Sequence, residues 1–161
     1  MLPPDRSAVD PASDVAAPDA ALGVVRRTRI LDSELSVDRV LSYVSGPAVG
    51  GVGLFVGLVR DVDEGQGVTS LDYSQHPSAE ATLLRCAEWV ADKYDVVAIA
   101  VEHRVGHLVV GDLAVVVAVG AVHRGDALAA CRQLIDDVKA EVPIWKEQHF
   151  LSGDAQWVGL T

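Results

Sequence analysis

A proline near the C-terminal end constrains the local backbone of this chain more than any other residue. Over residues 125–142, apolar side chains recur at helical spacing and define a face that we expect to be buried, formed by Leu128, Cys131, Leu134, Ile135 and Val138. Pro143 follows at once. Proline cannot continue a helix and disfavours the α conformation in the residue before it. We therefore predict a helix that ends before Pro143 and an extended segment over residues 144–150.

Two lysines lie on either side of this proline. Lys139 is expected in the last helical turn, and Lys146 on the extended segment, next to Trp145. Two rigid elements can direct both ammonium groups into one small volume, and in a chain with a formal net charge of −10 this indicates an anionic ligand. Spacing alone leaves simpler interpretations open. A lysine in a last helical turn often only complements the helix dipole, and a lysine in a strand can protect a sheet edge.

The remaining sequence alternates strand and helix patterns in the order β-α-β-β-α-β-β-α-β. This order predicts an α+β domain with helices packed on a mixed sheet. The glycine-rich strand at 49–59 permits another backbone to approach closely. Residues 61–68 are expected to form a polar loop, after which strand 69–75 pairs back onto 49–59. The other predicted strands are 24–31, 96–105, 113–122 and 156–158, and the other predicted helices are 37–44 and 79–94.

Length and composition predict one folded domain behind a tail. Residues 1–22 are rich in Ala, Asp and Pro, and we expect them to be disordered, whereas residues 23–161 are expected to form the domain. Hydrophobic residues make up 50% of the chain and charged residues 22%, as in globular proteins. We find neither a secretory signal nor an apolar run of about 20 residues, so we predict a cytoplasmic protein without a membrane span.

Several classes of site are not expected. No cysteine and histidine cluster has zinc spacing, and we predict neither a metal nor a cofactor. The negative net charge argues against nucleic-acid binding. Cys86 and Cys131 lie on predicted apolar helix faces, which favours buried thiols over reactive ones. The three tryptophans, Trp89, Trp145 and Trp157, are most simply interpreted as core residues.

Further basic residues stand at the ends of predicted elements, where binding groups are often presented. Arg60 follows the glycine-rich strand, and His123 and Arg124 immediately precede the last helix. Arg124 and the free N–H groups of that helix can together hold a phosphate. Taken singly, a histidine here is more often structural, and Arg60 with Asp61 can be an ordinary surface pair. The residues themselves therefore predict an α+β domain with an anion pocket and go no further.

The combination of these segments resembles the large, catalytic subunit of molybdopterin synthase. The resemblance covers roughly residues 24–158. It rests on six segments that occur in the family's order: Gly57–Asp61, Tyr73–Pro77, His103–Gly106, Gly111–Asp112, His123–Arg124 and Lys139–Lys146.

The resemblance implies a hammerhead-like α+β fold and a sulfur-transfer reaction. In that family, cyclic pyranopterin monophosphate receives two sulfurs and becomes molybdopterin. By this resemblance Lys139 is the main catalytic group, and Lys146 is catalytic as well as substrate-binding. Arg60, His123 and Arg124 would bind the substrate phosphate and an incoming carboxylate.

The same resemblance implies partners. The sulfur donor would be the C-terminal thiocarboxylate of a small ubiquitin-like subunit ending in Gly-Gly, and two large subunits would form the central dimer of a heterotetramer. This sequence ends Gly159-Leu160-Thr161, so we expect the donor to be a separate chain. Two other hypotheses stay open. One is a non-catalytic module of the same fold that captures a partner's carboxylate tail, and the other is a phosphate-binding domain without a partner.

Overall fold

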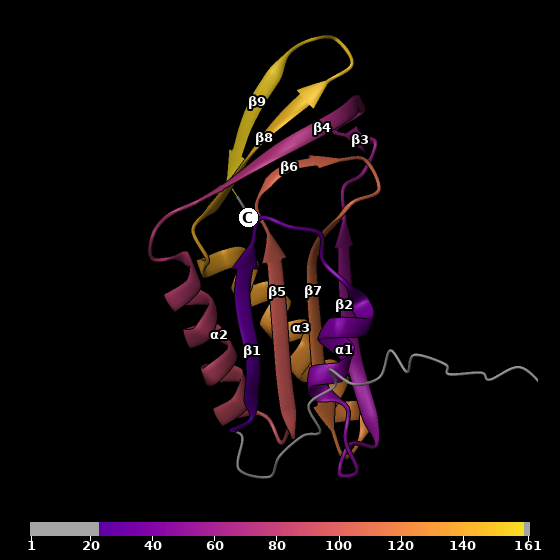
Figure 1. Cartoon of the computed structure of the whole chain (residues 1–161), viewed down its shortest axis with the longest axis vertical. Coiled ribbons are helices and arrows are strands. Elements are labelled where there is room, and N and C mark those ends of the chain that lie inside the picture. The colour runs from indigo at the N-terminus through magenta and orange to yellow at the C-terminus, as the bar shows by residue number, and fades with distance from the viewer. Residues whose placement is uncertain (1–22, 160–161) are drawn as a thin grey trace, which may run out of the picture.

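Four strands form the main sheet of the computed structural model, which describes residues 23–159 (Figure 1). In spatial order they are β1 (Val25–Leu31), β5 (Ala98–Arg104), β7 (Leu113–Ala121) and β2 (Gly51–Leu58). β1 and β5 are parallel, while β5 with β7 and β7 with β2 are antiparallel. The sheet is therefore mixed, as predicted. The tail predicted over residues 1–22 lies outside the described residues.

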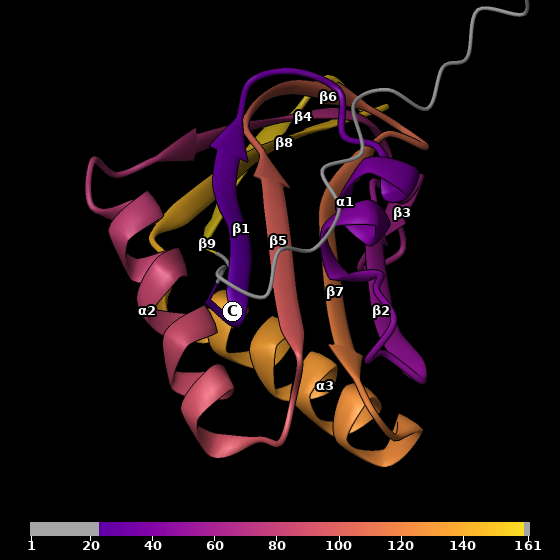
Figure 2. The ribbon, with the colours of Figure 1, turned by 60° about the horizontal axis from the view of Figure 1, so that its bottom comes forward.

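Helices cover both faces of this sheet. They are α1 (Val37–Val44), α2 (Ala79–Lys93) and α3 (Arg124–Glu141). Figure 2 shows α2 and α3 on one face and α1 on the other, and each face has its own apolar cluster. A strand buried on both faces needs a continuous apolar run. The central strand β7 has one, since eight of its nine residues are buried.

The junction after α3 has the predicted form. The helix ends at Glu141, Val142 is extended, and β8 (Ile144–Phe150) begins directly after Pro143. Lys139 therefore lies in the last turn and Lys146 on the following strand. The predicted burial of Leu128 is wrong, because its exposed fraction is 58%.

A close approach of two backbones explains this error. A Cβ at Gly53 would lie 2.3 Å from the Ala127 carbonyl oxygen, so the first turns of α3 press against β2. Only small side chains fit between them, and Ala127 and Ala130 occupy the buried positions instead of Leu128. The expectation that the glycines of this strand admit a neighbouring backbone is confirmed.

A second sheet crosses the end of the first (Figure 1). Its centre is β4 (Gln66–Gln75), which pairs with β3 (Val62–Asp63), β6 (Gly106–Val109) and β8, while β9 (Ala155–Gly159) pairs with β8. The predicted pairing of 69–75 with 49–59 is wrong. The predicted polar loop at 61–68 is instead a hairpin, whose two-residue turn has φ of 48° at Glu64 and 80° at Gly65.

The tryptophans do not belong to the core, contrary to the prediction. Trp89, Trp145 and Trp157 have exposed fractions of 48%, 43% and 61%. Aliphatic side chains fill both clusters next to the main sheet. Among residues 23–159, no helix is long and apolar enough to cross a membrane.

Two neighbouring polar residues of β5 are buried on opposite faces of the main sheet, because side chains alternate along a strand. Glu102 is fully buried and accepts hydrogen bonds from Arg27, at 3.1 Å, and from Arg39. His103 is 4% exposed, and its Nδ1 donates to the Arg104 carbonyl oxygen at 2.8 Å. Burial lowers the pKa of His103 to about 4, and the charge of Lys139 adds to this lowering.

We expect Arg39→Ala to lower the free energy of unfolding by about 2 kcal/mol, because it leaves the buried Glu102 carboxylate with Arg27 alone. Urea denaturation at neutral pH measures this. Arg132→Ala is the matched control. It breaks an exposed 4.0 Å pair with Asp136 and should cost less than about 0.5 kcal/mol. Equal losses in the two variants would contradict the assigned role of Glu102.

The pKa of His103 predicts a pH-dependent stability. Between pH 6.5 and about 4 the unfolded chain binds a proton at this residue and the folded chain does not. The free energy of unfolding therefore falls as the pH is lowered through this window, by up to about 3 kcal/mol. Denaturation of wild type and His103→Gln at several pH values isolates the contribution. The difference between their pH slopes should be confined to this window, and parallel slopes would exclude the buried neutral imidazole.

Candidate active site

Three cationic side chains from separate elements meet at one cavity of about 220 Å³. Arg60 follows the end of β2, Lys139 lies in the last turn of α3, and Lys146 lies on β8. The chain has only three lysines, and two of them line this cavity. The rest of the lining includes the polar residues Tyr73 and His103 and the apolar residues Phe55, Leu58, Val115, Ile135 and Val138. The structure thus brings together three of the five residues predicted for the site.

The surroundings of Lys146 lower its pKa. It is half-buried, and the β4–β8 register places it opposite Tyr73. Burial is the largest cause of its lowered pKa, Asp63 opposes the lowering, and Lys139 and Arg60 add to it. A lysine in this state loses its proton more easily than a solvated one.

Arg60 is an exposed part of the cavity lining. Its side chain is 76% exposed, and its Nη2 donates to Asp63 Oδ1 at 3.3 Å. The partner is therefore Asp63 and not the adjacent Asp61. Because an exposed ion pair of this kind contributes little energy, an anionic ligand can take the place of Asp63 at modest cost.

Three polar side chains at the cavity were not assigned to it from the sequence. The ring of His103 meets that of Tyr73 edge to face, with centroids 5.2 Å apart. Since Nδ1 of His103 donates to a carbonyl, the neutral ring leaves Nε2 free to accept. Gln148 lines an adjoining hollow of about 60 Å³, and its buried Oε1 has no donor among the described residues. The sequence did contain a signal for Gln148. Residues alternate between the two faces of a strand, so Gln148 lies on the same face of β8 as Lys146.

His123 and Arg124 are not part of this cavity. They are exposed and lie at the N-terminal end of α3, whereas Lys139 lies near its C-terminal end. The rise along a helix separates Arg124 from Lys139 by about 22 Å. Within one chain, His123 and Arg124 are therefore too far from the two lysines to bind the same phosphate.

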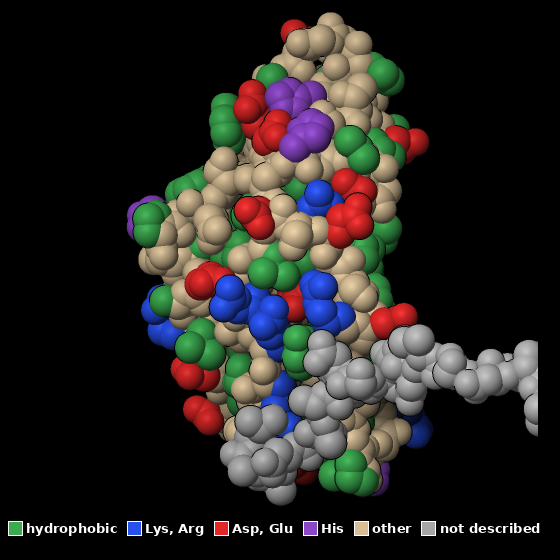
Figure 3. All heavy atoms as spheres, viewed as in Figure 1, with side chains coloured by type: hydrophobic (Ala, Val, Ile, Leu, Met, Phe, Trp, Pro, Cys, Tyr) green, Lys and Arg blue, Asp and Glu red, His purple; other side chains and the backbone are tan. Residues whose placement is uncertain are grey.

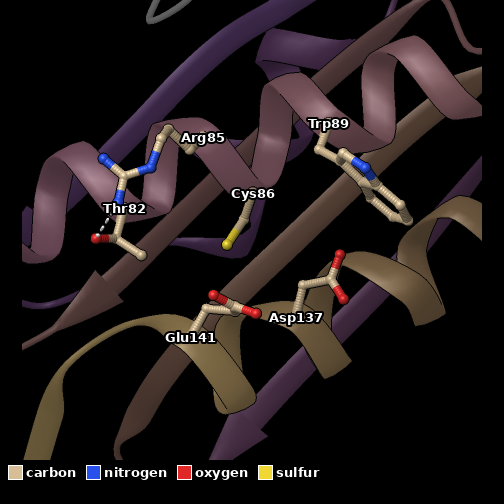
Figure 4. A pocket seen from close by; sticks show the side chains of 6 residues that line it. All are labelled: Thr82, Arg85, Cys86, Trp89, Asp137 and Glu141. Atoms are coloured by element: carbon tan, nitrogen blue, oxygen red, sulfur yellow. Dashed lines mark hydrogen bonds between the residues drawn. The ribbon is translucent and has the colours of Figure 1, made fainter.

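A second hollow, of about 320 Å³, opens between α2 and α3 (Figure 4). Although larger, it suits an anion poorly, because Asp137 and Glu141 face Cys86 across it and Arg85 is the one cation of its lining. Burial, followed by the charges of these two carboxylates, raises the pKa of the Cys86 thiol to about 11. Burial also raises the pKa of Cys131 to about 11. Both cysteines are free and buried, so the prediction of buried thiols is confirmed.

Known proteins match this chain over most of its length. A family model described as MoaE protein matches residues 30–141. The molybdopterin synthase catalytic subunit 1 of Mycobacterium tuberculosis is 46% identical over 140 residues, which cover 86% of this chain and 95% of that protein. The molybdopterin synthase catalytic subunit of Halalkalibacterium halodurans is 34% identical over 135 residues, which cover 83% of this chain and 86% of that protein.

A solved structure has the same fold. The crystal structure of molybdopterin synthase from Staphylococcus aureus matches with a TM-score of 0.76 at 29% identity, covering 81% of this chain and 95% of the matched one. Sequence and structure agree on the classification, and the resemblance noted from the motifs is confirmed. This chain belongs to the MoaE family, the catalytic subunits of molybdopterin synthase.

Proposed function

We propose that this chain catalyses the sulfur-transfer step of molybdopterin synthesis, in which cyclic pyranopterin monophosphate receives two sulfurs. The observation that carries the proposal is the convergence of Arg60, Lys139 and Lys146 on one cavity in a chain of net charge −10. A phosphorylated substrate and a thiocarboxylate are both anions, and each needs a positive counter-charge in the same small space. Focused positive charge in a cleft attracts such ligands even when the whole protein is acidic.

The sulfur donor in this proposal is the C-terminal thiocarboxylate of a small ubiquitin-like subunit ending in Gly-Gly. The buried thiols with raised pKa values at Cys86 and Cys131 are poor sulfur carriers, so the sulfur has to come from another molecule. An extended Gly-Gly tail is narrow, and a cavity of about 220 Å³ suits a narrow tail better than a folded surface. We also propose that two large subunits form the central dimer of a heterotetramer with two small subunits, and that this complex is cytoplasmic.

We assign the roles within the cavity from position and charge. Lys139 is the main catalytic group, assisting proton transfer or a covalent step from the rigid last turn of α3. Lys146, whose pKa is lowered by burial, holds an anion and can also accept a proton. Arg60 binds the phosphate or carboxylate, since its contact with Asp63 is weak and exposed.

Lys139→Ala should reduce the rate of dithiolene formation by at least about 100-fold, because general acid–base groups commonly contribute that much. The assay mixes the purified chain with thiocarboxylated small subunit and cyclic pyranopterin monophosphate. Lys93→Ala is the matched control. Lys93 lies at the end of α2, with its ammonium 4.5 Å from the Trp89 ring centre, and its loss should leave the rate unchanged.

Each failure of this assay has a defined meaning. Full activity in Lys139→Ala would remove that lysine from the chemistry. No product from wild type would refute the enzyme proposal. Binding of the small subunit's tail without turnover would instead favour the non-catalytic capture module.

We also propose that His123 and Arg124 act in the cavity of a second copy. They are about 22 Å from Lys139 of their own chain, so a contribution to a shared substrate requires another protomer. The strand β2 offers a suitable surface for such a dimer. It is one of the two edge strands of the main sheet, and it exposes Leu54 and Leu58.

A complementation experiment tests the shared site. Lys139→Ala and Arg124→Ala should each be nearly inactive alone. After unfolding, mixing and refolding together, random dimers should recover about a quarter of wild-type activity, because half of them are mixed and each mixed dimer has one intact site. If a mixture that contains mixed dimers recovers no activity, Arg124 does not act in the partner's cavity.

A further inference from the structure

Three strands of the second sheet present a cluster of metal-ligand side chains on one face. Asp72 on β4 is paired with His107 on β6 and with Glu147 on β8. His149 lies two residues beyond Glu147 and therefore on the same face of the strand. In Figure 3, histidine and acidic side chains gather at the end of the molecule formed by β4, β6 and β8.

The side chains of this cluster already contact one another. His149 Nε2 is 2.7 Å from Asp72 Oδ2, and His107 Nδ1 is 3.0 Å from Asp72 Oδ1. One ligand atom from each of Asp72, Glu147 and His149 lies within 4.8 Å of the others. The hydrogen bond from His149 is the largest cause of the lowered pKa of Asp72, and His107 adds to it, so this carboxylate is ionised near neutral pH.

The cluster is separate from the cationic cavity. Along β4 and β8 the next pair in register is Tyr73 with Lys146, and both of these residues line the cavity. Because neighbouring residues of a strand face opposite sides, Asp72 and Glu147 lie on the other face of the same two strands. The mechanism proposed above uses none of the four residues.

We propose that Asp72, Glu147 and His149 form a binding site for a transition-metal dication of the zinc type, and that His107 supports it through its contact with Asp72. One imidazole nitrogen and two carboxylate oxygens, with water in the fourth position, suit Zn²⁺, whereas Mg²⁺ and Ca²⁺ prefer oxygen ligands alone. Ligand atoms of a tetrahedral zinc site are about 3.3 Å apart, given bonds of about 2.0–2.1 Å. The ligand atoms of Asp72, Glu147 and His149, which lie within 4.8 Å of one another, therefore reach this spacing by small movements of their side chains.

Binding would clamp β4 to β8 at their side chains. A metal held by Asp72 on β4 and by Glu147 and His149 on β8 fixes the spacing of these two strands, and the contact of His107 with Asp72 adds β6. Lys146 lies on β8 beside Glu147, so the clamp lies directly behind one of the cavity lysines. A ligand that binds only the folded chain also raises the stability of the fold.

Calorimetric titration of the full, tag-free chain with Zn²⁺ tests the proposal. We expect one Zn²⁺ per chain, a raised melting temperature, and visible absorption bands of tetrahedral Co²⁺ when Co²⁺ replaces Zn²⁺. Titration with Mg²⁺ should give no comparable binding. Absence of Zn²⁺ binding, or binding of Mg²⁺ as tight as that of Zn²⁺, would overturn the proposal.

Variants assign the binding to these residues. His107→Ala and His149→Ala should each weaken Zn²⁺ binding by at least about tenfold and reduce the gain in melting temperature. His107 is the variant least able to disturb folding, because its side chain is 61% exposed. His76→Ala is the matched control, since His76 is exposed and contacts Ser78 outside the cluster. Unchanged affinity in both cluster variants, or an equal loss in the control, would overturn the assignment.

Discussion

The close packing of α3 against the main sheet positions Lys139 and one wall of the cationic cavity. Gly53 lets the backbone of β2 approach Ala127, which fixes the start of the helix, and Pro143 fixes its end. Between these points the helix is rigid, so Lys139 has a defined place relative to Arg60 and β8. An added methyl group at Gly53 would shift the helix and with it one wall of the cavity.

Electrostatics distinguish the cationic cavity from the hollow between α2 and α3. The cavity with Arg60, Lys139 and Lys146 concentrates positive charge, and burial lowers the pKa of Lys146. The larger hollow between α2 and α3 contains two carboxylates and a thiol whose pKa is raised to about 11. An anion is therefore attracted to the smaller cavity, and size alone would have pointed to the wrong one.

The second sheet contributes a different chemistry on each of its faces. Tyr73, Lys146 and Gln148 face the cavity and its adjoining hollow, whereas Asp72, Glu147 and His149 face away from them. This separation follows from the two-residue period of a strand. The strand β8 therefore connects the anion site to the metal site proposed behind it.

Local sequence signals determined the α+β class and the three helices of the described residues. They also determined the end of α3 at Pro143 and the placement of one lysine on the helix and the other on the strand. These features depend on residues that are neighbours in the chain. The motifs also identified the family. The tertiary structure alone decided the pairing of β4 with β8, the exposure of Leu128 and the tryptophans, and the meeting of Arg60 with Lys139 and Lys146. These features depend on contacts between residues far apart in the chain, and no local pattern specifies which distant segment a strand will pair with.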